Sequence, residues 1–303
     1  MATKRHKNHK TFCEFCAFLW LKQMSAIPQN QSQSVEDIEI DLLLEGIYRQ
    51  YGFDFRNYAL ASLKRRVRNF IRDEHIGSVS LLQDRILHDP TWLERFVYKL
   101  SVNVSAMFRD PQFYLAFRQE VVPLLKTYPF IRIWLAGVSM GEEVYSLSIL
   151  LTEEGIYDRC RIYATDINDA VLKKAKEGIY PLEFMQTYTN NYIRAGGKKS
   201  FSDYYTAAYD NAIFQTSLRD NIVFAQHNLA TDSSFNEFHV ILCRNVMIYF
   251  NSELQAHVYN LLHESLVMFG VLGLGARETM KFSPHEQEYE EVDKTSRLYR
   301  RIA

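Results

Sequence analysis

The sequence predicts an α/β fold in which a mostly parallel sheet follows a small all-helical domain. Two patterns support this prediction. Apolar residues recur at helical spacing over about the first third of the chain, and from residue 131 onward short apolar strands alternate with helices. Strands that alternate with helices are typical of a parallel sheet covered on both faces. Sheets of this kind bind ligands where their strands end.

The composition is that of an ordinary globular protein without a strong charge bias. Of 303 residues, 47% are hydrophobic and 23% are charged, and the formal net charge is −1. A net charge near zero provides no general attraction to nucleic acid. No apolar run approaches the roughly 20 residues that span a bilayer. We therefore expect neither a nucleic-acid partner nor direct membrane insertion.

The four cysteines predict no metal site. Cys13 and Cys16 form a single C-x-x-C pair, whereas a zinc ribbon needs a second pair. The pair also does not open a helix after a strand, as a redox motif of the thioredoxin type would. Free cysteines agree with a reducing compartment, and we predict a cytoplasmic protein.

Residues 1–34 are predicted to be a disordered or extraneous extension. A basic cluster, Lys4 to Lys7, precedes the apolar stretch 15–21, which loosely resembles a secretory signal peptide. The apolar stretch is too short for such a signal, and charged residues flank it. Met24, followed by a stretch rich in Gln, Ser and Asn, suggests instead that residues 1–23 precede the native start.

Residues 35–107 are predicted to form a helical domain of about four helices. Leu63, Val67 and Phe70, for example, recur at spacings of four and three. One of these helices carries a dense group of cations: Lys64, Arg65, Arg66 and Arg68. A charge run of this kind is usually a solvated face, but its density also favours docking on an acidic surface.

Residues 108–303 are predicted to form the α/β domain. Asp110 and Pro111 begin a helix that extends to about residue 126. Strands are then expected at 131–136, 161–165, 238–243, 271–275 and 296–302, with helices at about 142–151, 168–176 and 252–269. The segment 181–222 departs from this alternation. It contains two adjacent glycines and many tyrosines, and it is predicted to be an inserted subdomain or a long excursion, outside the core.

The turn after the first of these strands is Gly137-Val-Ser-Met-Gly-Glu-Glu143. Its first five residues match the G-x-S-x-G elbow of serine hydrolases. However, no oxyanion segment lies upstream, and no histidine ends a strand in the order that a triad requires. A nicotinamide-binding turn needs G-x-G-x-x-G, so that the second glycine can approach a pyrophosphate. Ser139 stands in that place, which makes the nicotinamide hypothesis weaker still.

S-adenosylmethionine is the third candidate ligand for this turn. It carries no phosphate, and carboxylates can face its cationic methionyl group and its ribose. Glu143, at the start of the following helix, can accept a hydrogen bond from the ligand's ammonium group. Asp166 ends the next strand, 29 residues after Gly137, and can accept from both ribose hydroxyls. The alternative for Asp166 is the N-cap of a helix.

Six segments together resemble the CheR family of chemotaxis methyltransferases, and the resemblance runs from about Val35 to the C-terminus. The segments are Asn103–Asp110, Ile133–Ser146, Ala164–Ile167, Gly178–Tyr180, His227–Leu229 and Cys243–Phe250. The resemblance implies a Rossmann-like methyltransferase domain with one antiparallel strand in its sheet, and S-adenosyl-L-methionine as the cofactor. It also implies methyl transfer to glutamate side chains of methyl-accepting chemotaxis receptors. This is the reaction of a protein-glutamate O-methyltransferase in chemosensory adaptation.

Carried over by position, the resemblance implies two groups of site residues. Those that contact the cofactor or border its pocket are Asn103, Ser105, Arg109, Glu143, Asp166, Asn228, Leu229, Arg244 and Asn245. Arg109 and Tyr249 face the reacting centre. The chain departs from the family pattern at Ser105 (usually Thr), Met107 (Phe), Val138 and Met140 (smaller residues or Thr), Val144 (Pro), His239 (Asp) and Ala276–Glu278 (His-Ser-Glu).

The implied reaction needs neither a metal nor a strong general base. The sulfonium activates the methyl group, and a glutamate carboxylate, with a reference pKa of about 4.3, is already ionised near neutral pH. We expect Arg109 to hold one substrate oxygen while the other attacks. Tyr249 either closes the pocket or is a core residue. We expect the chain to act as a monomer, with the basic helix docking the receptor. The rival hypothesis is a CheR-like module that binds its cofactor, or a partner, without transferring a methyl group.

Overall fold

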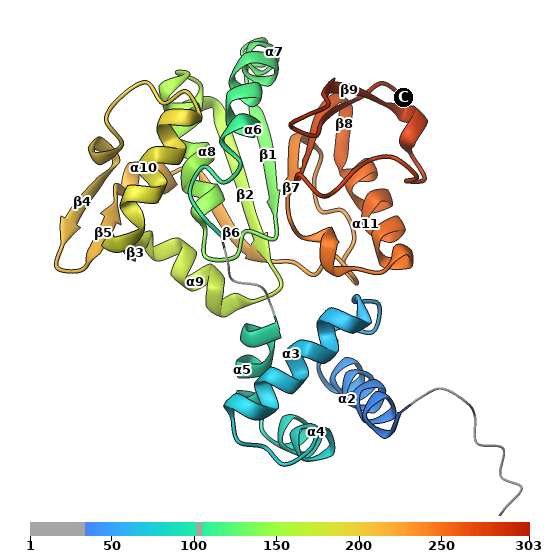
Figure 1. Ribbon diagram of the computed structural model, residues 1–303. Coiled ribbons are helices and arrows are strands. Elements are labelled where there is room, and N and C mark those ends of the chain that lie inside the picture. The colour runs from blue at the N-terminus through green and yellow to red at the C-terminus, as the bar shows by residue number, and fades with distance from the viewer. Residues whose placement is uncertain (1–33, 101–104) are drawn as a thin grey trace, which may run out of the picture. The chain divides into compact units, whose positions relative to one another are not determined.

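The computed structural model describes residues 34–100 and 105–303 (Figure 1). The extension predicted for residues 1–34 therefore lies almost wholly outside the described residues, as do Met24 and the Cys13–Cys16 pair. Asn103, one of the predicted cofactor residues, also lies outside them. None of the helices in the described ranges combines the length and the apolar composition that crossing a bilayer requires.

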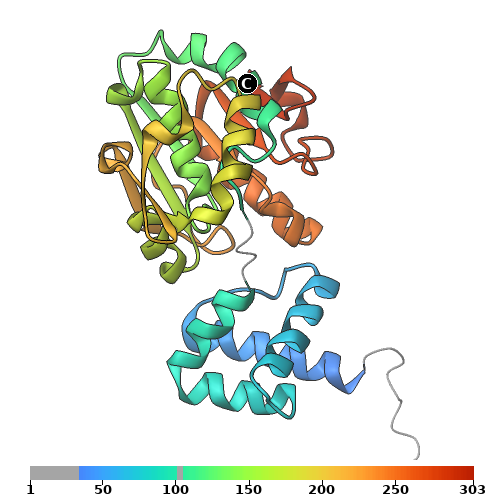
Figure 2. The same ribbon diagram turned by 60° about the vertical axis from the view of Figure 1, so that its left-hand side comes forward.

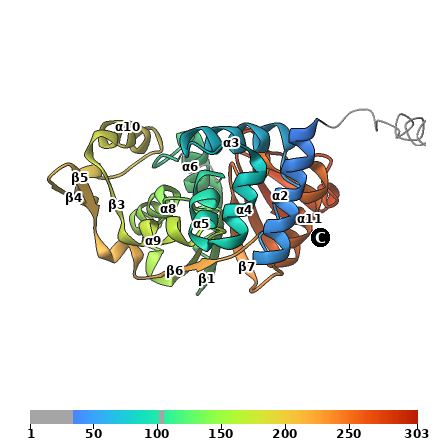
Figure 3. The same cartoon turned by 90° about the horizontal axis from the view of Figure 1, so that it is seen from below.

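Four helices form the described part of the N-terminal helical region. They are α2 (Val35–Tyr51), α3 (Leu60–Asp73), α4 (Val79–His88) and α5 (Pro90–Leu100). α3, α4 and α5 contact one another (Figure 3). α3 buries Leu63, Val67 and Phe70, the residues whose spacing predicted it.

A seven-stranded sheet in the order β6-β2-β1-β7-β8-β10-β9 forms the centre of the α/β domain (Figure 1). Its strands are β1 (Ile131–Ala136), β2 (Cys160–Asp166), β6 (Ile222–Gln226), β7 (Phe238–Cys243), β8 (Leu266–Leu274), β9 (Tyr289–Asp293) and β10 (Leu298–Arg301). Five neighbouring strands pair in parallel, whereas β10 runs antiparallel to both β8 and β9. The predicted mostly parallel sheet with one antiparallel strand is confirmed. β6 and β9 are strands that the sequence patterns do not predict.

Helices cover both faces of this sheet, as the central strand β1 illustrates. Ile133 and Leu135 face one hydrophobic core, to which α6 (Pro111–Ala116), α7 (Val122–Leu125) and α8 (Glu142–Glu153) contribute. Trp134 faces the second core, where α11 (Ser252–Ser265) packs. Successive side chains of a strand point to opposite faces. A strand buried on both sides is therefore almost continuously apolar.

The helix predicted over 252–269 ends earlier in the structure. α11 ends at Ser265, and Leu266 already pairs with Phe238 of β7 at the start of β8. The run from Leu266 to Phe269 is apolar, and a short apolar run fits a buried strand and a helix equally well. Pairing with β7 decides between the two, so the predicted boundary is wrong.

The segment predicted as an inserted subdomain, 181–222, lies between α9 (Asp169–Glu177) and β6. It contains α10 (Met185–Arg194) and most of a small antiparallel sheet, formed by β3 (Ile179–Pro181), β5 (Asn211–Phe214) and β4 (Tyr205–Ala208). α10 contacts α6 (Figure 2). Tyr188 and Tyr192 of α10 are buried in the first hydrophobic core. The expectation that this segment lies outside the core is therefore wrong, because its aromatic residues extend that core.

Candidate active site

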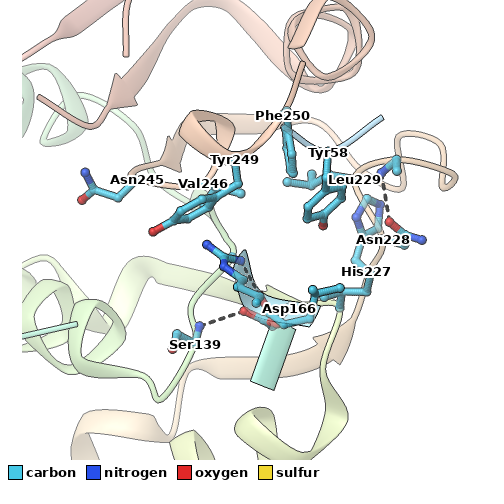
Figure 4. A pocket seen from close by; sticks show the side chains of 15 residues that line it. Tyr58, Ser139, Asp166, His227, Asn228, Leu229, Asn245, Val246, Tyr249 and Phe250 are labelled. Atoms are coloured by element: carbon cyan, nitrogen blue, oxygen red, sulfur yellow. Dashed lines mark hydrogen bonds between the residues drawn. The ribbon is translucent and has the colours of Figure 1, made fainter. Parts of the chain in front are cut away.

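The strand order reverses beside β1, since the chain continues to β2 and β6 on one side and returns to β7 and β8 on the other. A ligand site is expected at the carboxyl ends of the strands at such a reversal. Two adjoining hollows lie there, with open spaces of about 690 and 430 Å³. Both are lined by Gly137 and Ser139, which follow β1, and by Asn245, which follows β7. Figure 4 shows the larger hollow.

The glycine turn passes close to the segment that follows β7. Gly137 has a φ of 77°, and a Cβ atom on it would lie 2.5 Å from Cγ2 of Val246. The N–H groups of Gly137 and Val138 both donate to the carbonyl oxygen of Thr165, at 2.8 and 3.0 Å. Ser139 has a φ of 51°, a left-handed conformation that is uncommon outside glycine. The turn is therefore confined from two sides and has no room for a larger residue at position 137.

Asp166, at the end of β2, lines the larger hollow and is buried. Its carboxylate accepts from the backbone N–H of Ser139 at 2.9 Å (Figure 4). It also accepts from the backbone N–H of Asn168 at 3.0 Å. Burial raises the pKa of Asp166, and these hydrogen bonds oppose the shift. The N-cap alternative is wrong, because the side chain of Asn168 caps α9 by accepting from Ala170 N.

The contacts of His227 do not form a hydrolase triad. This histidine lines the larger hollow together with Ser139, but its Nε2 lies 3.2 Å from the carbonyl oxygen of Ser233. Its ring packs edge-on against Trp134, with ring centroids 5.2 Å apart. Asp166 accepts from backbone N–H groups and does not orient the imidazole. The match of the turn to a nucleophile elbow is therefore only a match of sequence.

The outer part of the larger hollow is lined by residues that lie far apart in the sequence. Asn228 and Leu229 follow β6, and Tyr249 follows β7. The side-chain oxygen of Asn228 accepts from Ala230 N at 3.0 Å and so holds a tight turn. Tyr58, which the sequence reasoning missed, packs edge-on against Phe250 with ring centroids 5.0 Å apart (Figure 4).

The smaller hollow is built around the buried guanidinium of Arg244. It pairs with the carboxylate of Glu143 at 2.6 Å and with that of Asp110 at 3.1 Å, and it donates to the carbonyl oxygen of Arg109 at 3.1 Å. Its Cζ lies 3.9 Å from the ring centroid of Phe113. Arg109 itself lines this hollow, as does Ser105. Glu143 therefore faces the hollow with one oxygen already held by Arg244.

Glu278 is a supporting residue that the sequence reasoning noted only as part of a departure from the family pattern. One oxygen accepts from the N–H groups of Asn245 and Gly275, at 2.9 and 2.6 Å. The other accepts from those of Val246 and Met247, at 2.9 and 2.8 Å. Burial raises the pKa of Glu278, and the four donors oppose the shift. In the sequence, the feature that could have indicated Glu278 is its place just after a strand, β8, which lies beside β7 in the sheet.

The structure separates the four cations predicted as a docking group. Arg65 and Arg68 are exposed and Lys64 is half-buried. Arg66 lines the larger hollow, donates to the carbonyl oxygen of Leu100, and lies with its Cζ 4.6 Å from the ring centroid of Tyr249. Burial lowers the pKa of Arg66. Arg66 therefore belongs to the candidate site, whereas the other three cations remain candidates for a docking surface.

Comparison with known proteins agrees with this site. Residues 103–297 match the family described as "CheR methyltransferase, SAM binding domain", and residues 38–101 match its "all-alpha domain". The chain belongs to the CheR methyltransferase family. It is 52% identical over 270 residues to a Pseudomonas putida protein that carries the name Cher3, covering 89% of this chain and 99% of that protein. It is 30% identical to "Chemotaxis protein methyltransferase" of Listeria innocua and to "Chemotaxis protein methyltransferase 2" of Pseudomonas aeruginosa. Each match covers 80% of this chain, and 92% and 86% of the respective relative.

Membership of the CheR family makes S-adenosylmethionine the cofactor. The residues predicted to contact it are brought together by the fold. All of them except Asn103, which is not described, line one of the two hollows. Arg109 and Tyr249, predicted to face one reacting centre, line different hollows that share Gly137, Ser139 and Asn245. Their individual roles stay predictions.

Proposed function

We propose that this chain transfers the methyl group of S-adenosylmethionine to glutamate side chains of methyl-accepting chemotaxis receptors and so forms glutamate methyl esters. The distribution of charge about the two hollows carries the proposal. The carboxylates of Asp166 and Glu143 lie beside strand ends and suit a cationic cofactor. Arg66 and Arg109 line the same hollows and suit an anionic acceptor.

In the proposed arrangement the cofactor extends along the glycine turn through both hollows. Its ribose lies against Asp166, and its adenine borders Asn228 and Leu229. Its methionyl group occupies the smaller hollow, where the ammonium shares Glu143 with Arg244. In this assignment the carboxylate of Glu143 accepts hydrogen bonds from two cations, the guanidinium of Arg244 and the ligand's ammonium. An ionised carboxylate has two acceptor oxygens and can do so.

The reaction joins a substrate carboxylate oxygen to the methyl carbon while the bond from that carbon to sulfur breaks. The bonding electron pair stays on sulfur, and no proton moves. Because an anion and a cation give neutral products, exclusion of water and fixed geometry are the main sources of rate enhancement. We assign Arg109 to hold one substrate oxygen, with Tyr249 beside the methyl group. Arg66, next to Tyr249, is a second candidate for the carboxylate contact.

The test is a transfer assay with the full chain, tritiated S-adenosylmethionine and receptor-containing membranes. Label that base releases as methanol supports an ester, whereas base-stable label would contradict carboxyl methylation. Calorimetry with S-adenosylhomocysteine serves as the parallel binding measurement. Binding without any transfer would favour the rival, a CheR-like module that holds its cofactor without catalysis. If the Arg109→Ala variant kept full methyl transfer and unchanged affinity for the receptor, Arg109 would not be the residue that holds the substrate carboxylate.

The receptor-docking surface is proposed to be the side of α3 that carries Lys64, Arg65 and Arg68. Attraction between this surface and an acidic receptor helix accelerates association and is weakened by salt. Charge reversal by Arg65→Glu and Arg68→Glu should slow association and flatten its salt dependence. An unchanged salt slope would contradict the assignment. We propose that the chain acts as a monomer in the cytoplasm.

A further inference from the structure

Three side chains with metal-ligand chemistry meet near the C-terminal end of α11, apart from both hollows. They are His263, in the last turn of α11, and His285 and Glu288, at the two ends of the 3₁₀ turn η7 (Glu286–Glu288). Each offers one ligand atom, and these atoms all lie within 4.8 Å of one another. Side chains three residues apart in a 3₁₀ turn lie almost above one another. His285 and Glu288 therefore point to the same side.

The geometry of the three groups is closely defined. The imidazole rings of His263 and His285 are parallel within 3°, with centroids 3.9 Å apart. Nε2 of His263 lies 3.3 Å from one oxygen of Glu288, and Nδ1 of His285 lies 2.7 Å from the other. One nitrogen of each ring and both carboxylate oxygens thus converge on one region.

The second nitrogen of each ring faces an oxygen outside the cluster. Nε2 of His285 lies 2.9 Å from Oδ1 of Asn260, and Nδ1 of His263 lies 3.3 Å from the hydroxyl of Tyr289. An amide oxygen only accepts, so Nε2 of His285 donates to Asn260. Nδ1 likewise donates to the carboxylate of Glu288 in this structure, and a metal ion would displace that proton and bind the nitrogen's lone pair. Histidines that ligate metals usually donate their other N–H to an oxygen in this way.

We propose that His263, His285 and Glu288 form a binding site for a divalent late transition-metal ion, with zinc as the best candidate. Two imidazoles and one carboxylate are a ligand set that zinc accepts, with water completing the coordination. The side chain of Glu288 is 36% exposed, which gives the ion a path from solvent. The positive charge of Arg301 lies near the cluster and would repel a bound cation. Its guanidinium, however, donates to the carbonyl oxygens of His263 and Leu266, at 3.0 and 2.6 Å, and these contacts satisfy it.

A metal here would join α11 to the segment that leads from β8 to η7. That segment includes Glu278, which holds the backbone of Asn245 to Met247 beside the hollows. The role of the ion would therefore be structural. The sequence prediction of no metal rested on the cysteine pair and not on these histidines, since His285 lies 22 positions after His263.

The test uses the full chain carrying Cys13→Ser and Cys16→Ser, which removes the competing thiol pair, after treatment with a chelator. Zinc is titrated in competition with a chromogenic chelator, and cobalt(II) is titrated by its visible absorption. One ion per chain is expected. His285→Ala and Glu288→Gln each remove a direct ligand and should weaken binding by more than the about 10- to 100-fold that loss of an outer-shell partner costs. His257→Ala, an exposed histidine of the same helix, is the matched control and should bind as the parent does.

A second measurement separates binding from folding. Zinc should raise the melting temperature of the parent and of His257→Ala, because an ion that binds the folded chain stabilises it. It should not raise that of His285→Ala, whose far-ultraviolet circular dichroism should match the parent. The absence of a one-to-one zinc complex in the parent would overturn the proposal. So would equal zinc affinity in the parent, His285→Ala and Glu288→Gln, which would leave the three side chains as an ordinary hydrogen-bonded cluster.

Discussion

Replacing Glu278 by Gln should destabilise the chain and weaken cofactor binding together. The carboxylate accepts from four backbone N–H groups, two on each oxygen. In Glu278→Gln one oxygen becomes an NH₂ donor, so two buried N–H groups face a donor instead of an acceptor. A buried polar group without its partner costs about 1–3 kcal/mol, so we expect about 2–6 kcal/mol of lost stability. Asn245 is one of the residues released, and it lines both hollows.

Urea unfolding measures the stability term, and calorimetry with S-adenosylhomocysteine measures binding. Glu120→Gln changes an exposed glutamate in the same way and should stay within about 0.5 kcal/mol of the parent. If Glu278→Gln were as stable as Glu120→Gln and bound the ligand equally well, the four hydrogen bonds would not be supporting the site. A stable variant with weak binding would restrict the role of Glu278 to the position of Asn245.

Three further predictions follow from particular contacts. Gly137→Ala should abolish measurable binding of S-adenosylhomocysteine, because its Cβ would lie 2.5 Å from Val246. The control is Gly155→Ala, where φ is 69° and the added Cβ would meet no atom within 4 Å. It should lower the melting temperature through backbone strain alone and leave binding unchanged. Arg66→Ala should lower methyl transfer by about tenfold or more, the equivalent of a lost charged hydrogen bond. Arg72→Ala, at an exposed arginine in the last turn of the same helix and outside the proposed docking surface, is the control and should transfer as the parent does. Burial raises the pKa of Glu142 from 4.5 to about 7, so its contribution to stability is full below pH 4.5 and is lost as the pH rises to about 7. Glu142→Gln should therefore gain up to about 3 kcal/mol on the parent between pH 4.5 and 8, measured by urea unfolding at each pH.

Local patterns predicted the parts of the site that depend on local geometry. The turn at Gly137 and the acid at Asp166 directly follow strands, and a strand end in a parallel sheet fixes where such residues lie. Arg66 could have been separated from its neighbours on the same grounds. At 100° per residue it falls beside the stripe formed by Leu63, Val67 and Phe70, away from Arg65 and Arg68.

Contacts between distant segments were not accessible from the sequence. Tyr58 reaches the larger hollow because two backbone hydrogen bonds hold its neighbours against the segment after β7. Ala59 N donates to the carbonyl oxygen of Tyr249 at 2.8 Å, and Asn251 N donates to that of Asn57 at 2.9 Å. About 190 residues separate these partners, and no periodicity records their pairing. The start of β8 at Leu266 has the same origin, since pairing with β7, and not the apolar run itself, ends the helix.

Arg244 makes the cofactor side and the acceptor side of the proposed site one unit. The guanidinium that orients Glu143 also fixes the backbone carbonyl of Arg109 and the carboxylate of Asp110. Removing one partner of a buried ion pair leaves an uncompensated charge and costs about 3–5 kcal/mol. A substitution of Arg244 would therefore release two carboxylates and free the segment that carries Arg109. Loss of cofactor binding and loss of acceptor positioning should then appear together, so Arg244 cannot be assigned to one function alone. The separate roles of Glu143 and Arg109 have to be measured by changing those side chains themselves.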